Sequence, residues 1–267
     1  MKRPNRIKES FKLPELTYRV WSVWRRDFDV FMKTWKVDFF PPLLEPLFYL
    51  VALGYGLGTF VQKIEGLSYI QFIAPALVAI SVMNSSFFEC TYGSFVRMYY
   101  QKTFDGIITT PVNVEEVIAG ELLWGATRSL ISSTIVLGVI AAFGLVSSPL
   151  FILTIPIAFL GGLMFSSMGM CFTAVAPNID FFNYPGFLFI TPMFLLSNTF
   201  FPISSFPQVM QSFAVAFLPL VHQVVLTRGL VLGNLQSLML MSIIWITVVT
   251  LFFFVLSINL MKRRLIK

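Results

Sequence analysis

The sequence predicts an all-α membrane protein with six transmembrane helices, and two features of the chain lead to this fold class. Hydrophobic residues make up 57% of the chain and charged residues 12%, whereas an average soluble domain is about 25% charged. Only five Lys or Arg residues lie between Lys36 and Lys262. The apolar stretches between them reach the roughly 20 residues with which a helix crosses a hydrocarbon core.

Basic residues at the two ends of the chain predict its orientation. Residues 1–36 hold ten Lys or Arg residues, and Lys262, Arg263, Arg264 and Lys267 follow the last apolar stretch. By the positive-inside rule both ends face the cytoplasm, which requires an even number of spans. A basic tail also suits nucleic acid, but this tail is interleaved with Trp and Phe residues, which favours a membrane surface. We therefore expect no nucleic-acid partner.

The first predicted element is an amphipathic helix over residues 14–35. Apolar residues recur in it at intervals of three or four positions (Leu16, Val20, Trp24, Phe28, Phe31 and Trp35), which is one face of a helix. We expect this face to lie in the headgroup layer; the alternative is a helix packed on a partner protein. Residues 1–36 would then form a cytoplasmic tail with an interfacial helix, and residues 37–267 a six-span transmembrane domain.

The six spans are apolar stretches bounded by polar or basic residues. We expect them at about residues 37–60, 69–92, 116–145, 149–176, 184–201 and 236–261. Gly54 and Gly58 form a G-x-x-x-G pattern in the first span, and Ala158, Gly162 and Ser166 follow one another at four-residue intervals in the fourth. Small residues at this spacing allow two membrane helices to approach closely.

Two segments between the spans carry further predictions. On the inner side, residues 93–115 contain apolar residues at helical spacing before Thr109, Thr110 and Pro111, which predicts a short amphipathic helix exposed to the cytoplasm. On the outer side, Pro and Gly residues break residues 202–234 into apolar pieces of about ten residues. Such pieces are too short to cross, so we expect either a re-entrant hairpin or two short helices in the outer leaflet.

Four polar residues in or near the spans are candidates for function. Glu89 and Arg128 are expected at membrane depth, where they either pair with each other, which we favour, or contact an anionic head group. His222, the only histidine, has no carboxylate nearby in sequence and is expected to be a polar residue at a helix end. Arg228 could meet a phosphate or an acidic sugar on the outer side. Cys90 and Cys171 lack the spacing of a metal site.

Two stretches of the chain resemble the membrane subunits of type-2 ABC exporters. Residues 95–128, FVRMYYQKTFDGIITTPVNVEEVIAGELLWGATR, resemble the coupling helix and the following span entry of that family. Residues 195–233, LLSNTFFPISSFPQVMQSFAVAFLPLVHQVVLTRGLVLG, resemble its outer segment before the last span. Within the family, FFECTYGSFVRM and GELLWGATR are most similar to the nodulation-factor exporter permeases, which move lipo-oligosaccharides. The resemblance extends from about residue 14 to the end of the chain.

The resemblance implies a multi-pass permease of the bacterial inner (cytoplasmic) membrane, with both termini in the cytoplasm. It implies a homodimer, or a pair with a sister permease, bound to two copies of a separate cytoplasmic ABC ATPase. ATP and Mg would bind to that ATPase, because this chain has no G-x-x-x-x-G-K-(S/T) loop to cradle a triphosphate. We therefore expect no enzyme activity of the chain alone, and no catalytic residue, metal or cofactor on it.

From this resemblance we expect residues 95–111 to bind in a groove on the ATPase. The apolar anchors would be Tyr100, Phe104, Ile107 and Ile108, with Arg97, Lys102 and Asp105 on the rim and Pro111 ending the segment. The alternative is a loop helix that packs only on its own chain. On the outer side aromatic residues cluster in the broken segment, where they could close an exit by packing and dewetting. The predicted gate comprises Phe200, Phe201, Pro202, Phe206, Phe213, Phe217, His222 and Arg228.

The expected cargo is amphipathic, a lipid-linked oligosaccharide or polysaccharide, chiefly because of the family likeness. A drug or small-lipid exporter of the same family is the alternative, followed by a permease for an unrelated hydrophobic product. An ion-driven secondary transporter would need ionisable residues or broken helices at the midplane, and the centres of the fourth and sixth spans carry no ionisable residue. A membrane-embedded enzyme would need a converging set of reactive residues, which the sequence does not suggest.

Overall fold

The predicted all-α membrane fold is confirmed by a computed structural model that describes residues 13–61, 63–64 and 66–266. The first part of the predicted basic tail, residues 1–12, and Lys267 lie outside the described residues. The described residues form no strand, and six of their helical segments are long and apolar enough to cross a membrane. These segments are Val20–Thr59, Tyr69–Tyr100, Val114–Ala142, Pro149–Val175, Ile179–Leu196 and Leu238–Leu265.

Several of these segments combine α-helix with tighter or wider turns. The α-helices are α1 (Val20–Tyr49), α2 (Tyr69–Phe88), α3 (Thr103–Ile108), α4 (Val114–Ala142), α5 (Thr154–Val175), α6 (Asn183–Pro185), α7 (Thr191–Leu196), α8 (Gln208–Phe217), α9 (Pro219–Leu232) and α10 (Leu238–Leu265). Wide, π-type turns occupy Leu50–Gly56, Glu89–Gly93, Val96–Tyr100 and Gly186–Ile190. Narrow, 3₁₀-type turns occupy Leu57–Thr59, Pro149–Leu153, Ile179–Phe182 and Ile203–Ser205.

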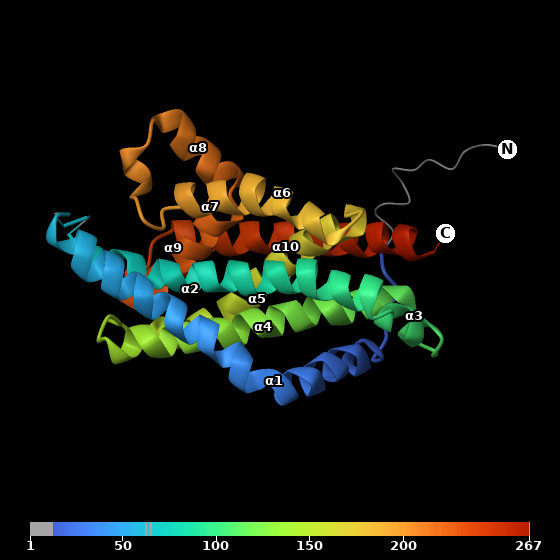
Figure 1. Cartoon of the computed structure of the whole chain (residues 1–267). Coiled ribbons are helices and arrows are strands. Elements are labelled where there is room, and N and C mark those ends of the chain that lie inside the picture. Colours follow the sequence, from blue (N-terminus) through green and yellow to red (C-terminus); the bar gives the residue numbers. More distant parts are fainter. Residues whose placement is uncertain (1–12, 62, 65, 267) are drawn as a thin grey trace.

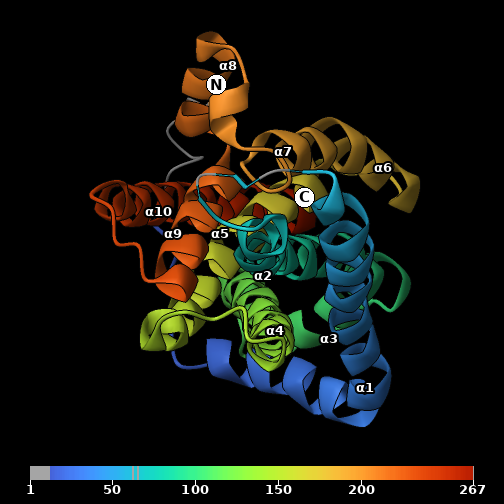
Figure 2. The ribbon, with the colours of Figure 1, turned by 90° about the vertical axis from the view of Figure 1, so that its left-hand side faces the viewer.

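Helices α2, α4 and α5 form the centre of the bundle, and the other long helices surround them. In the view along the bundle, α1 lies against the side of α4, α10 lies beyond α5, and α6 and α7 cover the opposite side (Figure 2). Both α3 and the C-terminus lie at one end of the bundle, which we call the α3 end (Figure 1). The opposite end, which carries α8, is called the α8 end. Each end has its own cluster of buried apolar side chains.

The helix α1 joins the predicted interfacial helix and the first span without a break. It runs through Lys36 and Val37 and contains Pro41, Pro42 and Pro46, and it changes direction part-way along (Figures 1 and 2). A proline inside a helix removes a hydrogen bond and favours a bend. The long helix therefore changes direction without ending between the two predicted elements.

Part of the aromatic face of α1 packs on α4 and not on lipid, whereas Leu16 and Trp35 of the same predicted face remain exposed, and for them the headgroup layer stays a prediction. The indole Nε1 of Trp24 donates to Thr127 Oγ1 at 2.8 Å. The rings of Phe28 and Phe31 lie 6.5 and 5.7 Å from the ring of Trp124. An aromatic stripe suits a protein neighbour as well as a lipid surface, since both bury apolar area.

The second span is longer than predicted and the inner helix is shorter. Helix α2 continues through its π-type turns to Tyr100, where the sequence predicts an end near residue 92. Lys102 then takes a left-handed backbone conformation with φ of 54°, which is uncommon for a residue other than Gly and turns the chain sharply. Of the predicted inner helix, only the six residues of α3 form an α-helix after this turn.

Small residues bring α4 and α5 into close contact, which confirms the packing predicted for Ala158, Gly162 and Ser166. The Ser129 hydroxyl donates to the carbonyl of Ala158 at 3.1 Å. A methyl group added at Gly162 would come within 1.8 Å of Ser129 Oγ, and one at Gly125 within 2.3 Å of Ser166 Oγ. No larger residue fits at these two glycines unless the helices separate.

The broken segment before the last span forms two helices at right angles. Helices α8 and α9 meet at 88°, so they are either one broken span or a re-entrant pair. Most of α9 is buried against α2, α5 and α10, whereas α8 stands away from the bundle (Figure 1). The sequence predicts either a re-entrant hairpin or two short helices in the outer leaflet. A pair of this shape is compatible with both.

Candidate functional site

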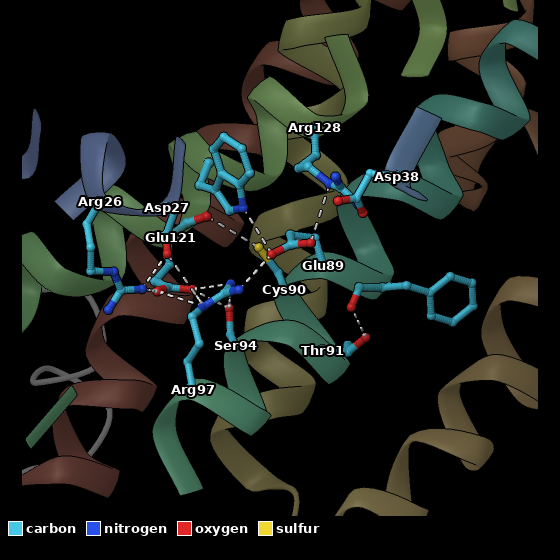
Figure 3. Close-up of polar contacts among 12 residues, drawn as sticks. Arg26, Asp27, Asp38, Glu89, Cys90, Thr91, Ser94, Arg97, Glu121 and Arg128 are labelled. Carbon is cyan, nitrogen blue, oxygen red and sulfur yellow. Dashed lines mark hydrogen bonds and ion pairs between the residues drawn. The ribbon is translucent and has the colours of Figure 1, made fainter. Parts of the chain in front are cut away.

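Charged side chains from three helices meet inside the α3 end of the bundle. Helix α1 contributes Arg26, Asp27 and Asp38, the extended second span contributes Glu89 and Arg97, and α4 contributes Glu121 and Arg128. We call these seven residues the charge cluster (Figure 3). It holds three arginines and four carboxylates, and each arginine forms an ion pair with at least two of the carboxylates.

Glu121 is the centre of the cluster, and its side chain is completely buried. Arg97 donates to it from Nε at 3.0 Å and from Nη2 at 2.6 Å, Ser94 Oγ donates at 2.7 Å, and Arg26 Nη2 lies 3.4 Å away. A buried carboxylate is stable only when charges and hydrogen bonds replace its water. The fold provides both, from α1 and from the extension of α2 (Figure 3).

Glu89 connects this centre to Arg128, which confirms the favoured pairing of these two residues. Arg97 Nη1 donates to Glu89 Oε1 at 2.8 Å, and Arg128 Nε lies 3.6 Å from Glu89 Oε2. Arg128 also donates to Asp38 Oδ1 at 2.9 Å, and Trp124 Nε1 donates to Glu89 Oε1 at 3.0 Å. The pair is thus one edge of a larger network that joins α1, α2 and α4.

Sequence reasoning missed most of this network. Arg26, Asp27, Asp38 and Glu121 were not candidates, because Arg26 and Asp27 belong to a stretch with many exposed charges. One signal was available: Glu121, Trp124 and Arg128 recur at intervals of three and four, so they share one face of α4. A polar stripe on a helix at membrane depth generally faces protein or water.

A cavity of about 260 Å³ opens between α1 and α2 beside the cluster. Six members of the cluster line it together with aromatic and small apolar side chains. Its lining includes Arg26, Asp27, Val30, Phe31, Asp38, Glu89, Arg97, Trp124 and Arg128. The cavity therefore offers charged groups of both signs next to ring faces.

The segment from Tyr99 to Pro111 forms the tip of the α3 end. Tyr100, Lys102, Asp105 and Pro111 are exposed, with Tyr100 exposed to 58%. Phe104 is fully buried in the core cluster of this end, and Ile107 and Ile108 pack partly against that cluster. We call the exposed residues of this segment, together with Ile107 and Ile108, the α3 tip.

Two of the predicted coupling residues are therefore corrected. Phe104 cannot anchor in another protein as predicted, because its side chain already fills the core of its own chain. Arg97 does not lie on a rim: it points into the charge cluster, and only 16% of its side chain is exposed. Of the apolar residues at helical spacing in residues 96–108, some pack inside the chain and others are exposed.

A hydrogen bond joins the tip to the start of α1, and polar contacts at the start of α4, which follows the tip in the chain, reach Thr17 and the end of α10. Arg19 donates to the Pro111 carbonyl, and Asn113 caps α4 by accepting from the Glu116 amide at 2.8 Å. Glu116 accepts from Thr17, and Glu115 pairs with Lys262 near the end of α10. A displacement of the tip would therefore act directly on the start of α1 and, through the start of α4, on the end of α10.

At the α8 end, the predicted gate residues are distributed over two places. His222 is buried, with Nε2 2.9 Å from the Val215 carbonyl and Nδ1 3.1 Å from Ser242 Oγ, and it stacks on Trp245. Because a carbonyl only accepts, Nε2 carries a proton. Arg228 Nη2 donates to the carbonyls of Phe72 and Asn198 at 3.0 and 2.7 Å. Both residues thus hold α9 to its neighbours.

The aromatic residues of the predicted gate do not form a single cluster in the described part of the chain. Phe200 is buried, with its ring 4.9 Å from that of Phe194. Phe213 and Phe217 form an exposed pair on α8 with ring centres 5.3 Å apart. Phe201 is also exposed, and Pro202 and Phe206 are half-buried. The exposed rings thus belong to α8 and the turn that precedes it.

Comparisons with known proteins place this geometry in context. A family model described as ABC-2 type transporter matches residues 18–231. Nodulation protein J of Sinorhizobium fredii is 33% identical over 254 residues, which cover 95% of this chain and 97% of that protein. Nodulation protein J of Bradyrhizobium diazoefficiens is 35% identical, with 96% of this chain and 97% of that protein covered.

A more distant relative is also a membrane transport protein. The inner membrane transport permease YadH of Escherichia coli is 24% identical over 190 residues, which cover 71% of this chain and 74% of that protein. No solved structure matches the chain.

Proposed function

Because this chain belongs to the ABC-2 type transporter family, we propose that it is the membrane permease subunit of an exporter driven by a separate ABC ATPase. The observation that carries the proposal is the α3 tip. It presents exposed residues at one end of a six-span bundle, is hydrogen-bonded to the start of α1, and leads into α4, whose Glu115 pairs with Lys262 of α10. A conformational change in a soluble partner bound to the α3 tip can therefore be transmitted to the spans.

In this proposal the α3 end faces the cytoplasm of a bacterium and the membrane is the inner membrane. The basic cluster Lys262–Arg264 lies in the last turn of α10, at the same end as α3. Basic residues at a membrane boundary favour the cytoplasmic side. Both termini would then be cytoplasmic, and the α8 end would be the outer end.

The contact with the ATPase is assigned to the exposed part of the α3 tip. Tyr100 and Pro111 offer apolar surface, Ile107 and Ile108 are half-buried at the base, and Lys102 and Asp105 offer charges. Aromatic residues at the centre of a small contact commonly dominate its binding energy. Phe104 and Arg97 serve the contact indirectly, since they fix the tip and the second span to the bundle.

We assign a second permease copy to the exposed face of α1. Phe40, Leu44 and Phe48 are exposed along this face and Val51 just beyond the end of α1. The exposed Glu45 lies among them with no ion pair in the described residues. A carboxylate that faces lipid at membrane depth costs about 2.5–3.5 kcal/mol on insertion scales. A protein neighbour removes that cost, so the face is better covered by a homodimer partner than by lipid.

A cysteine at this face should cross-link two copies of the chain. Phe48→Cys, at a side chain exposed to 68%, is expected to give a disulfide-linked homodimer in native membranes after mild oxidation. Leu240→Cys on α10, exposed to 70%, is the matched control and should stay monomeric. The unmodified chain, with Cys90 buried and Cys171 half-buried, sets the background. Cross-linking only to a sister permease, or equally at both positions, would contradict the homodimer.

The proposed cargo is an amphipathic molecule, a lipid-linked oligosaccharide or polysaccharide. Its support is the similarity to Nodulation protein J over nearly the whole chain together with a polar cavity at the expected inner end. The exit would pass the α8 end, where Phe201, Phe213 and Phe217 expose rings that can close a path by packing and dewetting. The alternative cargo, a drug or small lipid, would leave the polar cavity without a role in recognition.

Co-purification tests the proposed division of labour. The permease should purify as a complex with its ABC ATPase, and ATP hydrolysis should belong to that partner. Hydrolysis by the purified permease alone would contradict the proposal.

A further inference from the structure

We propose that the cavity between α1 and α2 binds one sugar residue of the cargo. The inference rests on the proposed function, since it names the part of the substrate that this chain recognises. At about 260 Å³ the cavity is slightly below the usual size of pockets for drug-sized ligands. It can therefore hold a single ring of a longer headgroup, but not a whole oligosaccharide.

Two residues that line the cavity, Arg26 and Asp27, carry buried hydrogen-bonding atoms without partners. The Asp27 side chain is only 3% exposed, and its Oδ1 pairs with Arg26. Its Oδ2 has no hydrogen-bond partner within the described part of the chain, and neither do Nε and Nη1 of Arg26. Buried polar atoms are rarely left unpaired in native proteins. One acceptor and two donors thus lie just beneath the cavity surface, where a bound hydroxyl group would reach them once the Arg26 side chain turns toward it.

The charges around the cavity select against ions. Every arginine of the cluster is already paired with carboxylates, and the cluster as a whole has four carboxylates for three arginines. A phosphate would be repelled by Asp27, Asp38 and Glu89, which line the cavity, and a cation by the three arginines. A hydroxyl group suits both kinds of neighbour, because it donates to a carboxylate and accepts from a guanidinium.

Aromatic side chains complete a surface suited to a sugar ring. Phe31 and Trp124 line the same cavity, with ring centres 5.7 Å apart. The indole Nε1 of Trp124 is fixed by Glu89, which holds its ring in place. Only 3% of Trp124 is exposed, so the half-buried Phe31 is the ring on which the C–H face of a sugar packs while its hydroxyls reach the charged groups, and the site thereby distinguishes a sugar from a purely apolar molecule.

The position of the cavity fits loading from the inner side. It lies at the α3 end, within reach of the cytoplasmic boundary, and it is lined by the same Arg97 that joins the second span to α4. A sugar bound here would bridge α1 and α2 next to the residues that lead to the α3 tip. Binding and movement of the tip could then influence each other through the charge cluster.

Two variants test the site in permease nanodiscs without the ATPase. Val30→Trp fills the cavity without removing a charge, because Val30 lines it and is 55% exposed. Asp27→Asn removes the charged acceptor. The matched controls on the same helix are Val37→Trp, at an exposed residue outside the cavity, and Asp29→Asn, at an exposed carboxylate. Circular dichroism confirms that each variant is folded.

Binding is measured by saturation-transfer NMR with two neutral sugars, cellotetraose and maltotetraose, and with inorganic phosphate as the anionic probe. At least one sugar should bind the unmodified chain and both controls equally. We expect about tenfold weaker sugar binding to Asp27→Asn, the usual worth of a hydrogen bond to a charged group, and no detectable binding to Val30→Trp.

Three results would overturn the sugar site: no sugar binding to the unmodified chain, sugar binding unchanged in Val30→Trp, or phosphate binding in place of sugar. If the chain exports cargo with its ATPase but shows one of these results, only the sugar site fails. If sugars bind as expected but no ATP-driven export occurs, the sugar site stands and the proposed function fails. The two ideas are therefore tested separately.

Discussion

Arg97→Met should destabilise the protein by about 3–5 kcal/mol, the usual cost of removing one partner from a buried ion pair. Arg97 binds Glu121 through two nitrogen atoms and Glu89 through a third. Without it, the fully buried Glu121 retains Ser94 and the more distant Arg26. The free energy of unfolding is measured by titrating detergent-solubilised protein with dodecyl sulfate and following its circular dichroism.

Two further variants make this result specific to the charge cluster. Arg25→Met changes an exposed arginine of α1 and should alter the free energy of unfolding by less than about 0.5 kcal/mol. Adding Glu121→Gln to Arg97→Met should restore much of the lost stability, because Glu89 keeps Arg128 and Trp124 as partners. If Arg97→Met unfolds like the unmodified chain, the cluster does not hold α1, α2 and α4 together.

The double variant Tyr100→Asp, Asp105→Lys should abolish co-purification with the ABC ATPase. Both side chains are exposed on the α3 tip, so the bundle should remain folded while the contact is lost. Loss of one aromatic hot spot commonly costs 2 kcal/mol or more, which corresponds to about thirtyfold weaker binding. The measurement is the amount of ATPase recovered with the tagged permease.

The control for this experiment lies at the other end of the molecule. Lys63→Asp reverses an exposed charge in the loop between α1 and α2, at the α8 end, and should leave ATPase recovery unchanged. Phe104→Asp is unsuitable as a test, because Phe104 is buried in its own chain and its loss would disturb α3 directly. Full recovery of ATPase with the double variant would remove the α3 tip from the interface.

The sequence predicts the spans well where composition alone decides them. The third, fourth and sixth spans agree with α4, with Pro149–Val175 and with α10 to within four residues at each end. Each of them is an apolar run bounded by turn residues or by a basic cluster, which are local signals. The small residues at Gly162 and Ser166 likewise predict close packing, because the signal needs no knowledge of the partner helix.

The predictions that failed depend on contacts between distant parts of the chain. Helix α2 runs on to Tyr100 because Glu89 and Arg97 find partners on α1 and α4, between 24 and 70 residues away in sequence. Phe104 is apolar at helical spacing in either role, so spacing could not distinguish an anchor in the ATPase from a core residue. The same ambiguity placed the whole aromatic face of α1 in the headgroup layer although Trp24, Phe28 and Phe31 pack on α4.

The central claim is that this chain moves cargo only with power from a separate ATPase. It is tested most directly by reconstituting the permease in liposomes and following a fluorescent lipid-linked oligosaccharide across the membrane. We expect ATP-dependent movement that requires both proteins, survives an ionophore that collapses ion gradients, and disappears with Tyr100→Asp, Asp105→Lys. Movement that is driven by an ion gradient, or that proceeds with no ATPase present, would contradict the claim.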